Sequence, residues 1–154
     1  GGFKTYDLFI RMNKPHQILS MDSTSSSSGI TLSGEVFQHP DYGTNMPPRN
    51  ININTNPCLA FDSYFDANGS LAGFFFEPDF TAWPSPMRTL WFPTLGVASR
   101  GTTNAAFGGA LYYYRIMRIT LGTGGSIGGA IGVGGRHFDG TQDINIELAI
   151  PALP

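Results

Sequence analysis

The sequence predicts an all-β protein: a two-sheet antiparallel β-sandwich, jelly-roll or Greek-key-like, with long Pro-rich loops. Strong helix formers are scarce, since the 154 residues include only two Lys and three Glu. Gly, Asn, Thr, Ser and aromatic residues take their place, a mixture that suits pleated strands joined by turns. Apolar residues alternate along several short runs, and helical periodicity is nowhere sustained. A closed barrel is the alternative architecture.

The length fits one domain, residues 1–154, and the apolar fraction of 41% is enough for a core without metals or disulfides. The first strand is expected over residues 3–11, where Tyr6, Leu8 and Ile10 form the better-buried face. Further strands are expected over residues 16–21 and 29–39, the second with a bulge or bend at Ser33-Gly34.

The middle of the chain mixes loops and strands. Residues 40–57 hold four of the eleven prolines and are predicted to be a long surface loop, with Ile51 and Ile53 a possible short edge strand. Residues 59–65 are predicted to be a strand, joined by a turn to a hairpin partner over 71–77. Residues 78–93 carry large aromatic side chains among four prolines, which forbid a central strand.

The strongest strand is predicted over residues 109–121, and both of its faces are substantially apolar, which indicates a central position. Strict alternation places Arg115 and Arg118 on opposite faces. A glycine-rich strand follows over residues 126–133, where glycines would let another backbone approach closely. The last strand, residues 144–150, sets four aliphatic side chains on one face: Ile144, Ile146, Leu148 and Ile150.

Charge and hydropathy exclude two classes of partner. The net charge is −2 and the nine basic residues are scattered, so nucleic acid is not expected. No stretch approaches the roughly 20 apolar residues of a membrane span. The chain begins Gly1-Gly2 without Met, as a mature secreted product does once a signal peptide is removed, and a residue pair left by a cleaved tag is the alternative. We expect an extracellular or cell-surface location.

Three short motifs resemble a group of secreted bacterial proteins known from planctomycetes and similar bacteria. They are Thr5-Tyr6-Asp7-Leu8, the run Cys58-Leu59-Ala60-Phe61-Asp62-Ser63-Tyr64-Phe65 and the run Tyr114-Arg115-Ile116-Met117-Arg118-Ile119-Thr120-Leu121. Members often end in a Pro-rich linker before a sorting helix of the PEP-CTERM type, and Ile150-Pro151-Ala152-Leu153-Pro154 is similar to the start of that linker. The Gly-rich residues 122–135 depart from the pattern. The resemblance implies an exported β-sandwich and carries over no catalytic residues.

No catalytic, cofactor or metal site is predicted. His16, His39 and His137 are far apart and lack metal-ligand spacing. The Gly-rich residues 122–129 match neither the dinucleotide fingerprint nor a P-loop. Residues 66–69 and 139–143 are similar to calcium loops in composition, but neither completes an EF-hand.

Two further features leave alternatives open. Cys58 precedes an apolar run and is expected to be a buried thiol, with an intermolecular bridge as the alternative. Glu77 and Asp79 flank a proline, a spacing that a secreted glycan-active enzyme could use, although two acids in such a turn are more often solvated.

Aromatic side chains exceed what one core needs. Tyr112, Tyr113 and Tyr114, with residues 74–76, Trp83 and Trp91, put aromatic area on both faces of their strands. A loop or a partner must cover the excess. A carbohydrate-binding module of the cell surface is one function that would use it.

The leading hypothesis is an extracellular structural subunit that self-assembles into a filament or surface layer by strand addition. The expected assembly residues are those of the two terminal strands: Tyr6, Leu8, Ile10, Ile144, Ile146, Leu148 and Ile150. The partners are identical subunits and, as an alternative, surface glycans. Asn68 in Asn68-Gly69-Ser70 is a predicted N-glycosylation site, and residues 23–28 are a hydroxyl-rich loop open to O-linked sugars.

Overall fold

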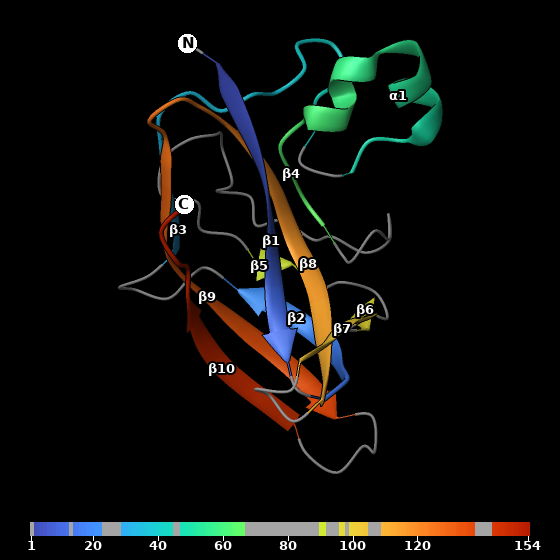
Figure 1. Ribbon diagram of the computed structural model, residues 1–154, viewed down its shortest axis with the longest axis vertical. Coiled ribbons are helices and arrows are strands. Elements are labelled where there is room, and N and C mark those ends of the chain that lie inside the picture. Colours follow the sequence, from blue (N-terminus) through green and yellow to red (C-terminus); the bar gives the residue numbers. More distant parts are fainter. Residues whose placement is uncertain are drawn as a thin grey trace.

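The computed structural model describes residues 2–12, 14–22, 29–44, 47–66, 90–91, 96–97, 99–104, 109–137 and 143–154. Over these residues the protein is all-β, with two antiparallel sheets and two short helical segments, which confirms the predicted fold class (Figure 1).

The first sheet is built around β8 (Gly109–Gly122). One edge of β8 pairs with β1 (Phe3–Met12), and its other edge pairs with β4 (Tyr64–Phe65) and β7 (Ser99–Asn104). The predicted central position of this strand is therefore confirmed. In Figure 1 β1 and β8 run side by side along the length of the molecule.

The second sheet is built around β9 (Ser126–His137), which pairs with β2 (His16–Asp22), β3 (Gly29–Ser33) and β10 (Asp143–Ala149). β2 also pairs with β5 (Leu90–Trp91) and β6 (Gly96–Val97). The strands expected at 3–11, 16–21, 126–133 and 144–150 are all present, and their ends differ from the expected ones by four residues at most. The strand expected at 29–39 ends at Ser33.

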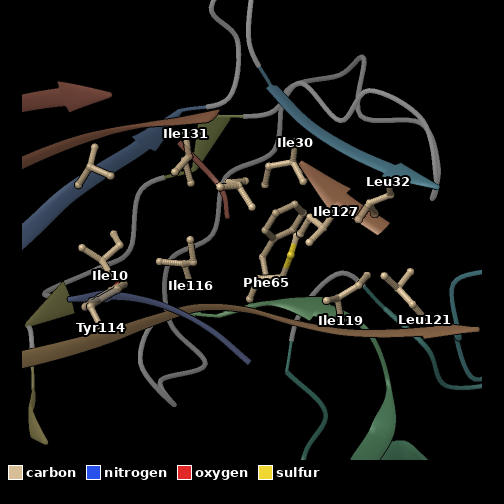
Figure 2. Close-up of a cluster of buried hydrophobic side chains, with 13 residues drawn as sticks. Ile10, Ile30, Leu32, Phe65, Tyr114, Ile116, Ile119, Leu121, Ile127 and Ile131 are labelled. Atoms are coloured by element: carbon tan, nitrogen blue, oxygen red, sulfur yellow. The ribbon is translucent and has the colours of Figure 1, made fainter. Parts of the chain in front are cut away.

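The core lies between the two sheets and draws side chains from both (Figure 2). Met117, Ile119 and Leu121 enter it from β8, and Ile127 and Ile131 enter it from β9. The other buried members are Ile10, Ile30, Leu32, Phe65, Tyr114, Ile116, Val133 and Ile150. Burial of this apolar surface is the main force that holds the sheets together.

Two glycine backbones lie in close contact at the turn between β8 and β9. Gly34 follows β3 with a φ of 89°, a conformation that side chains with a Cβ rarely adopt. A Cβ on Gly34 would lie 2.9 Å from the Cα of Gly125, which belongs to the β8–β9 turn. The predicted bend at Ser33-Gly34 is therefore present, and it brings two backbones into direct contact.

Residues 50–55 and 57–61 are helical, and here the sequence predictions are wrong. Asn50–Thr55 form α1 in place of a loop or edge strand, and Pro57–Phe61 form the 3-10 helix η1 in place of a strand over 59–65, of which only β4 remains. Pro57 fixes a helical φ at the start of η1, and the main-chain N–H of Leu59 donates to the carbonyl of Asn56 (2.9 Å). The apolar run at 59–61 resembles a strand only when this proline is ignored.

We predict that Gly34→Ala destabilises the protein more than Gly124→Ala does. Gly124 has a similar φ, 87°, but a Cβ added there would meet nothing within 4 Å, so its substitution adds only backbone strain of roughly 1 kcal/mol. Gly34→Ala adds the contact with Gly125, which raises the loss by a further ~1–3 kcal/mol. Denaturant unfolding of both variants measures the difference, and equal losses would mean that the close approach is relaxed at little cost.

Candidate functional site

A β-bulge in β8 brings two arginines to the same face. Leu8 pairs with Met117 and Phe9 pairs with Arg115, so Ile116 has no partner across β1. The extra residue shifts the alternation by one. Ile116 and Met117 both point into the core, and Arg115 and Arg118 both lie on the outer face of the first sheet. The predicted placement of the two arginines on opposite faces is therefore wrong.

Two aspartates hold these guanidinium groups in place. Arg118 donates two hydrogen bonds to Asp7, from Nε to Oδ1 (2.7 Å) and from Nη2 to Oδ2 (2.9 Å). Its Nη1 donates to the carbonyl of Ala60 (2.9 Å). Arg115 donates from Nε to Asp66 Oδ2, and its Nη1 lies 3.7 Å from Asp7 Oδ2. A bidentate Arg–carboxylate pair fixes the geometry of both groups more firmly than an ion pair with a single hydrogen bond does.

The charged groups of this cluster shift one another's pKa values. Burial raises the pKa of Asp7, but the hydrogen bond and charge of Arg118 and the charge of Arg115 outweigh it, so the pKa lies below its usual 3.8. The Asp7 hydrogen bond in turn raises the pKa of Arg118. Burial raises the pKa of Tyr64, whose ring lies 6.0 Å from each of the two guanidinium carbons. Asp7 and Arg118 are therefore both charged at neutral pH.

An arginine-lined cleft of about 310 Å³ opens between this face and the covering segment, residues 47–61. Its walls are formed by Pro47, Pro48, Arg49, Asn50, Ile53, Leu59, Ala60, Tyr64, Arg115 and Arg118. Every charged residue in this lining is an arginine. Asp7 and Asp66, the ion-pair partners of Arg115 and Arg118, are not part of this lining, and Asp66 is fully buried.

A second buried carboxylate, Asp62, anchors the covering segment to the loop after β3. Its Oδ1 accepts the main-chain N–H of His39 (2.8 Å), and the neighbouring Ser63 Oγ accepts the N–H of Thr120 (2.9 Å). Among the described residues Oδ2 has no hydrogen-bond partner. Burial raises the pKa of Asp62, and the backbone hydrogen bond from His39 offsets part of that shift.

An apolar groove of about 530 Å³ lies beside the N-terminal half of β1 and is lined by Phe3, Thr5, Phe37, Cys58, Phe61 and Thr120. Phe3 is 47% exposed and Phe61 is 56% exposed. Cys58 is exposed here, so the expectation of a buried thiol is wrong. In η1 the side chain that turns inward is Leu59, and Cys58, one residue earlier, faces the groove.

The expected assembly residues lie in the terminal strands of this chain. Ile10 and Ile150 belong to the core between the sheets. Tyr6, Leu8 and Leu148 pack against that core and are half-buried. In β10, Ile144 and Ile146 stand opposite Gly135 and Val133 of β9.

Other candidate residues have mixed positions. His16 and His137 stand opposite each other across β2 and β9, whereas His39 lies in a loop, where its Nδ1 accepts the N–H groups of Asp41 and Tyr42. Within the described ranges no three His, Cys, Asp or Glu side chains form a metal-binding group. Tyr114 is a core residue, and Tyr113 contacts Phe9 on the outer face.

Several candidates lie outside the described residues. They are Asn68 and its turn, residues 23–28, the hairpin partner 71–77 with the aromatic residues 74–76, Glu77, Asp79, Trp83 and most of the loop 139–143.

Sequence reasoning missed the cluster of Asp7, Asp66, Arg115 and Arg118. The available signal was the presence of two arginines, three residues apart, in an otherwise apolar central strand. Such charges need buried partners, and a bulge is required for one cluster to hold both.

Comparison with protein-family models, with curated proteins and with solved structures found no match. Neither α1 nor η1, the helices of the described part of the chain, is long and apolar enough to cross a bilayer.

We predict that Asp7→Asn lowers the free energy of unfolding by about 1–2 kcal/mol at pH 7, because it removes the charged acceptor of two Arg118 hydrogen bonds that are partly open to water. The pKa of Asp7 is lowered on folding, so its contribution is complete above pH 3.8 and is lost as the pH falls through the folded-state value. The gap between parent and variant should therefore narrow toward pH 2.

Urea unfolding at several pH values measures this gap. Asp41→Asn is the control, because Asp41 is an exposed loop aspartate outside the cluster. A gap of the same size at pH 2 and pH 7 would show that Asp7 acts through packing instead of charge.

Proposed function

We propose that the protein is an extracellular structural subunit whose copies join head to tail, by pairing the open edge of β1 with the β10 edge of the next copy. The observation that carries this proposal is the edge of β1. β1 is ten residues long, and among the described residues it pairs with β8 alone. A long unpaired edge is a template for another strand.

The main-chain groups that face this edge can be identified. The N–H of Gly122 donates to the carbonyl of Glu35, and the carbonyl of Thr120 accepts the N–H of Phe37, so the main-chain N–H and C=O groups of these two β8 residues point away from β1. In an antiparallel ladder, the main-chain groups of the residues opposite them then point away from β8. Their partners Phe3 and Thr5 therefore direct N–H and C=O groups outward.

Surface chemistry beside the two edges supports a second copy as the partner. The apolar groove lies over the outer face of β1 and β8, with Phe3 on its β1 side, and the outward side chains of a strand added to β1 would shield that side from water. β1 carries Lys4, Asp7 and Arg11, a net charge of +1, whereas β10 carries Asp143 and Glu147, a net charge of −2. Opposite charges favour β1 beside β10 over two β1 strands together.

Addition of an intact edge accounts better for the assembly than exchange of a terminal strand. Withdrawal of β10 would remove Leu148 and leave Ile150 without its place in the core, and withdrawal of β1 would remove Ile10. Each loss creates a cavity that costs ~2–5 kcal/mol per large side chain. Edge pairing leaves both cores intact, and contact between unlike edges repeats into a filament unless the rotation between copies closes a ring.

We predict that Thr5→Pro abolishes association and preserves the fold. The N–H of Thr5 points to the open edge, so proline removes no bond to β8 and blocks the approach of a new strand. Thr5→Val is the matched control, because it also loses the 2.8 Å hydrogen bond to Thr120 Oγ1 but keeps the N–H. Sedimentation velocity and negative-stain microscopy measure assembly, and circular dichroism checks the fold.

Lys4→Gln separates the two possible edge partners, because it lowers the net charge of β1 from +1 to 0. It should weaken association if β1 meets the acidic β10, and it should strengthen association if β1 meets the basic β1 of another copy. Filaments formed by Thr5→Pro at the parental concentration would overturn the edge mechanism, and a parent that stays monomeric at millimolar concentration would overturn self-assembly itself.

A further inference from the structure

The arginine-lined cleft has the features of a binding site for one small anion. Its volume of about 310 Å³ lies at the lower end of the range for ligand sites, which suits a ligand of about one sugar ring. Three guanidinium groups contribute +3, and the two aspartates that brace them contribute −2, so the cluster carries a net charge of +1. A ligand with a single negative charge neutralises it.

The three arginines differ in how many of their nitrogen atoms are already hydrogen-bonded. All three nitrogen atoms of Arg118 donate to Asp7 or to the carbonyl of Ala60, and Arg115 is held by Asp66. Arg49 is exposed at the rim and forms no ion pair with the described residues. Its planar guanidinium group matches a carboxylate, so Arg49 is the group that would bind the charge. Arg115 and Arg118 are neutralised by Asp7 and Asp66 and present the positive ends of these ion pairs to the cleft.

The rest of the lining is suited to a sugar ring. Pro47, Pro48 and Ile53 present apolar surface that can cover the C–H face of a ring, and the amide of Asn50 offers both a donor and an acceptor to hydroxyl groups. A phosphate dianion would not use the apolar surface or the acceptor of the Asn50 amide, and its charge would exceed the net charge of the cluster.

We propose that this cleft binds a carboxylated sugar residue, a hexuronate, with its carboxylate on Arg49 and its ring between the covering segment and the outer face of the first sheet. This proposal does not depend on self-assembly, since the cleft lies on the opposite side of β8 from the β1 edge. A free monosaccharide and the end of a polyuronate chain present the same chemistry.

Titration of the ¹⁵N-labelled protein with D-galacturonate and D-glucuronate, followed by amide chemical shifts, tests the site. We expect saturable shifts at Asn50, Ile53 and Tyr64 with at least one uronate, and dissociation constants at least about tenfold weaker for D-galactose, acetate and inorganic phosphate. Tighter binding of a trigalacturonate than of the monomer would identify a chain end as the source, and equal binding would identify the free sugar.

Arg49→Gln and Asn50→Ala probe the two polar contacts, and both residues are exposed and outside the core. Arg49→Gln should weaken uronate binding by at least about tenfold. Lys4→Gln removes one exposed positive charge away from the cleft and should leave binding unchanged. Uronate affinity that equals that of galactose or acetate, or that survives Arg49→Gln, would overturn the proposal.

Discussion

Ile116, which has no partner across β1, decides which side chains of the central strand meet the core and which meet the outer face. Without the bulge, alternation would turn Arg115 and Arg118 to opposite faces, and one guanidinium would enter the core among Ile119 and Leu121. The cost of an unpaired buried charge would far exceed the loss of one strand pairing. The extra residue lets β8 keep apolar contacts along its whole inner face.

The same displacement creates the attachment point for the covering segment. With both arginines on one side, Arg118 can donate to the carbonyl of Ala60, and Arg115 can neutralise Asp66, whose main-chain N–H donates to the carbonyl of Ile116 (2.8 Å). The fully buried Asp66 is tolerated because it is paired. η1 is therefore attached to the first sheet by an ionic cluster, through Ala60, as well as by the buried side chain of Leu59.

Sequence patterns identify the strands whose alternation is complete, because burial of one face enforces a period of two. β1 and β10 show this clearly, with Tyr6, Leu8 and Ile10 on the inner face of β1. The same reasoning fails at 57–65, where Pro57 starts a 3-10 helix inside an apolar run, and at 115–118, where a one-residue bulge reverses the faces. Pro57 is a local signal for the helix, whereas no local pattern marks the bulge. The cleft depends on both, so the sequence identifies its arginines as unusual but not as neighbours.

The pairing of β1 with β8 also bears on the order in which the chain folds. Thr5 and Thr120 are 115 residues apart, and Asp7 and Arg118 are 111 apart. At typical synthesis rates β1 must wait roughly 5–20 seconds for its partner to emerge. Contacts at such separations also close slowly in the free chain. The apolar face of β1 stays exposed throughout that interval, so a holding chaperone or a delay in compaction until the last third of the chain is present would protect the chain from premature aggregation.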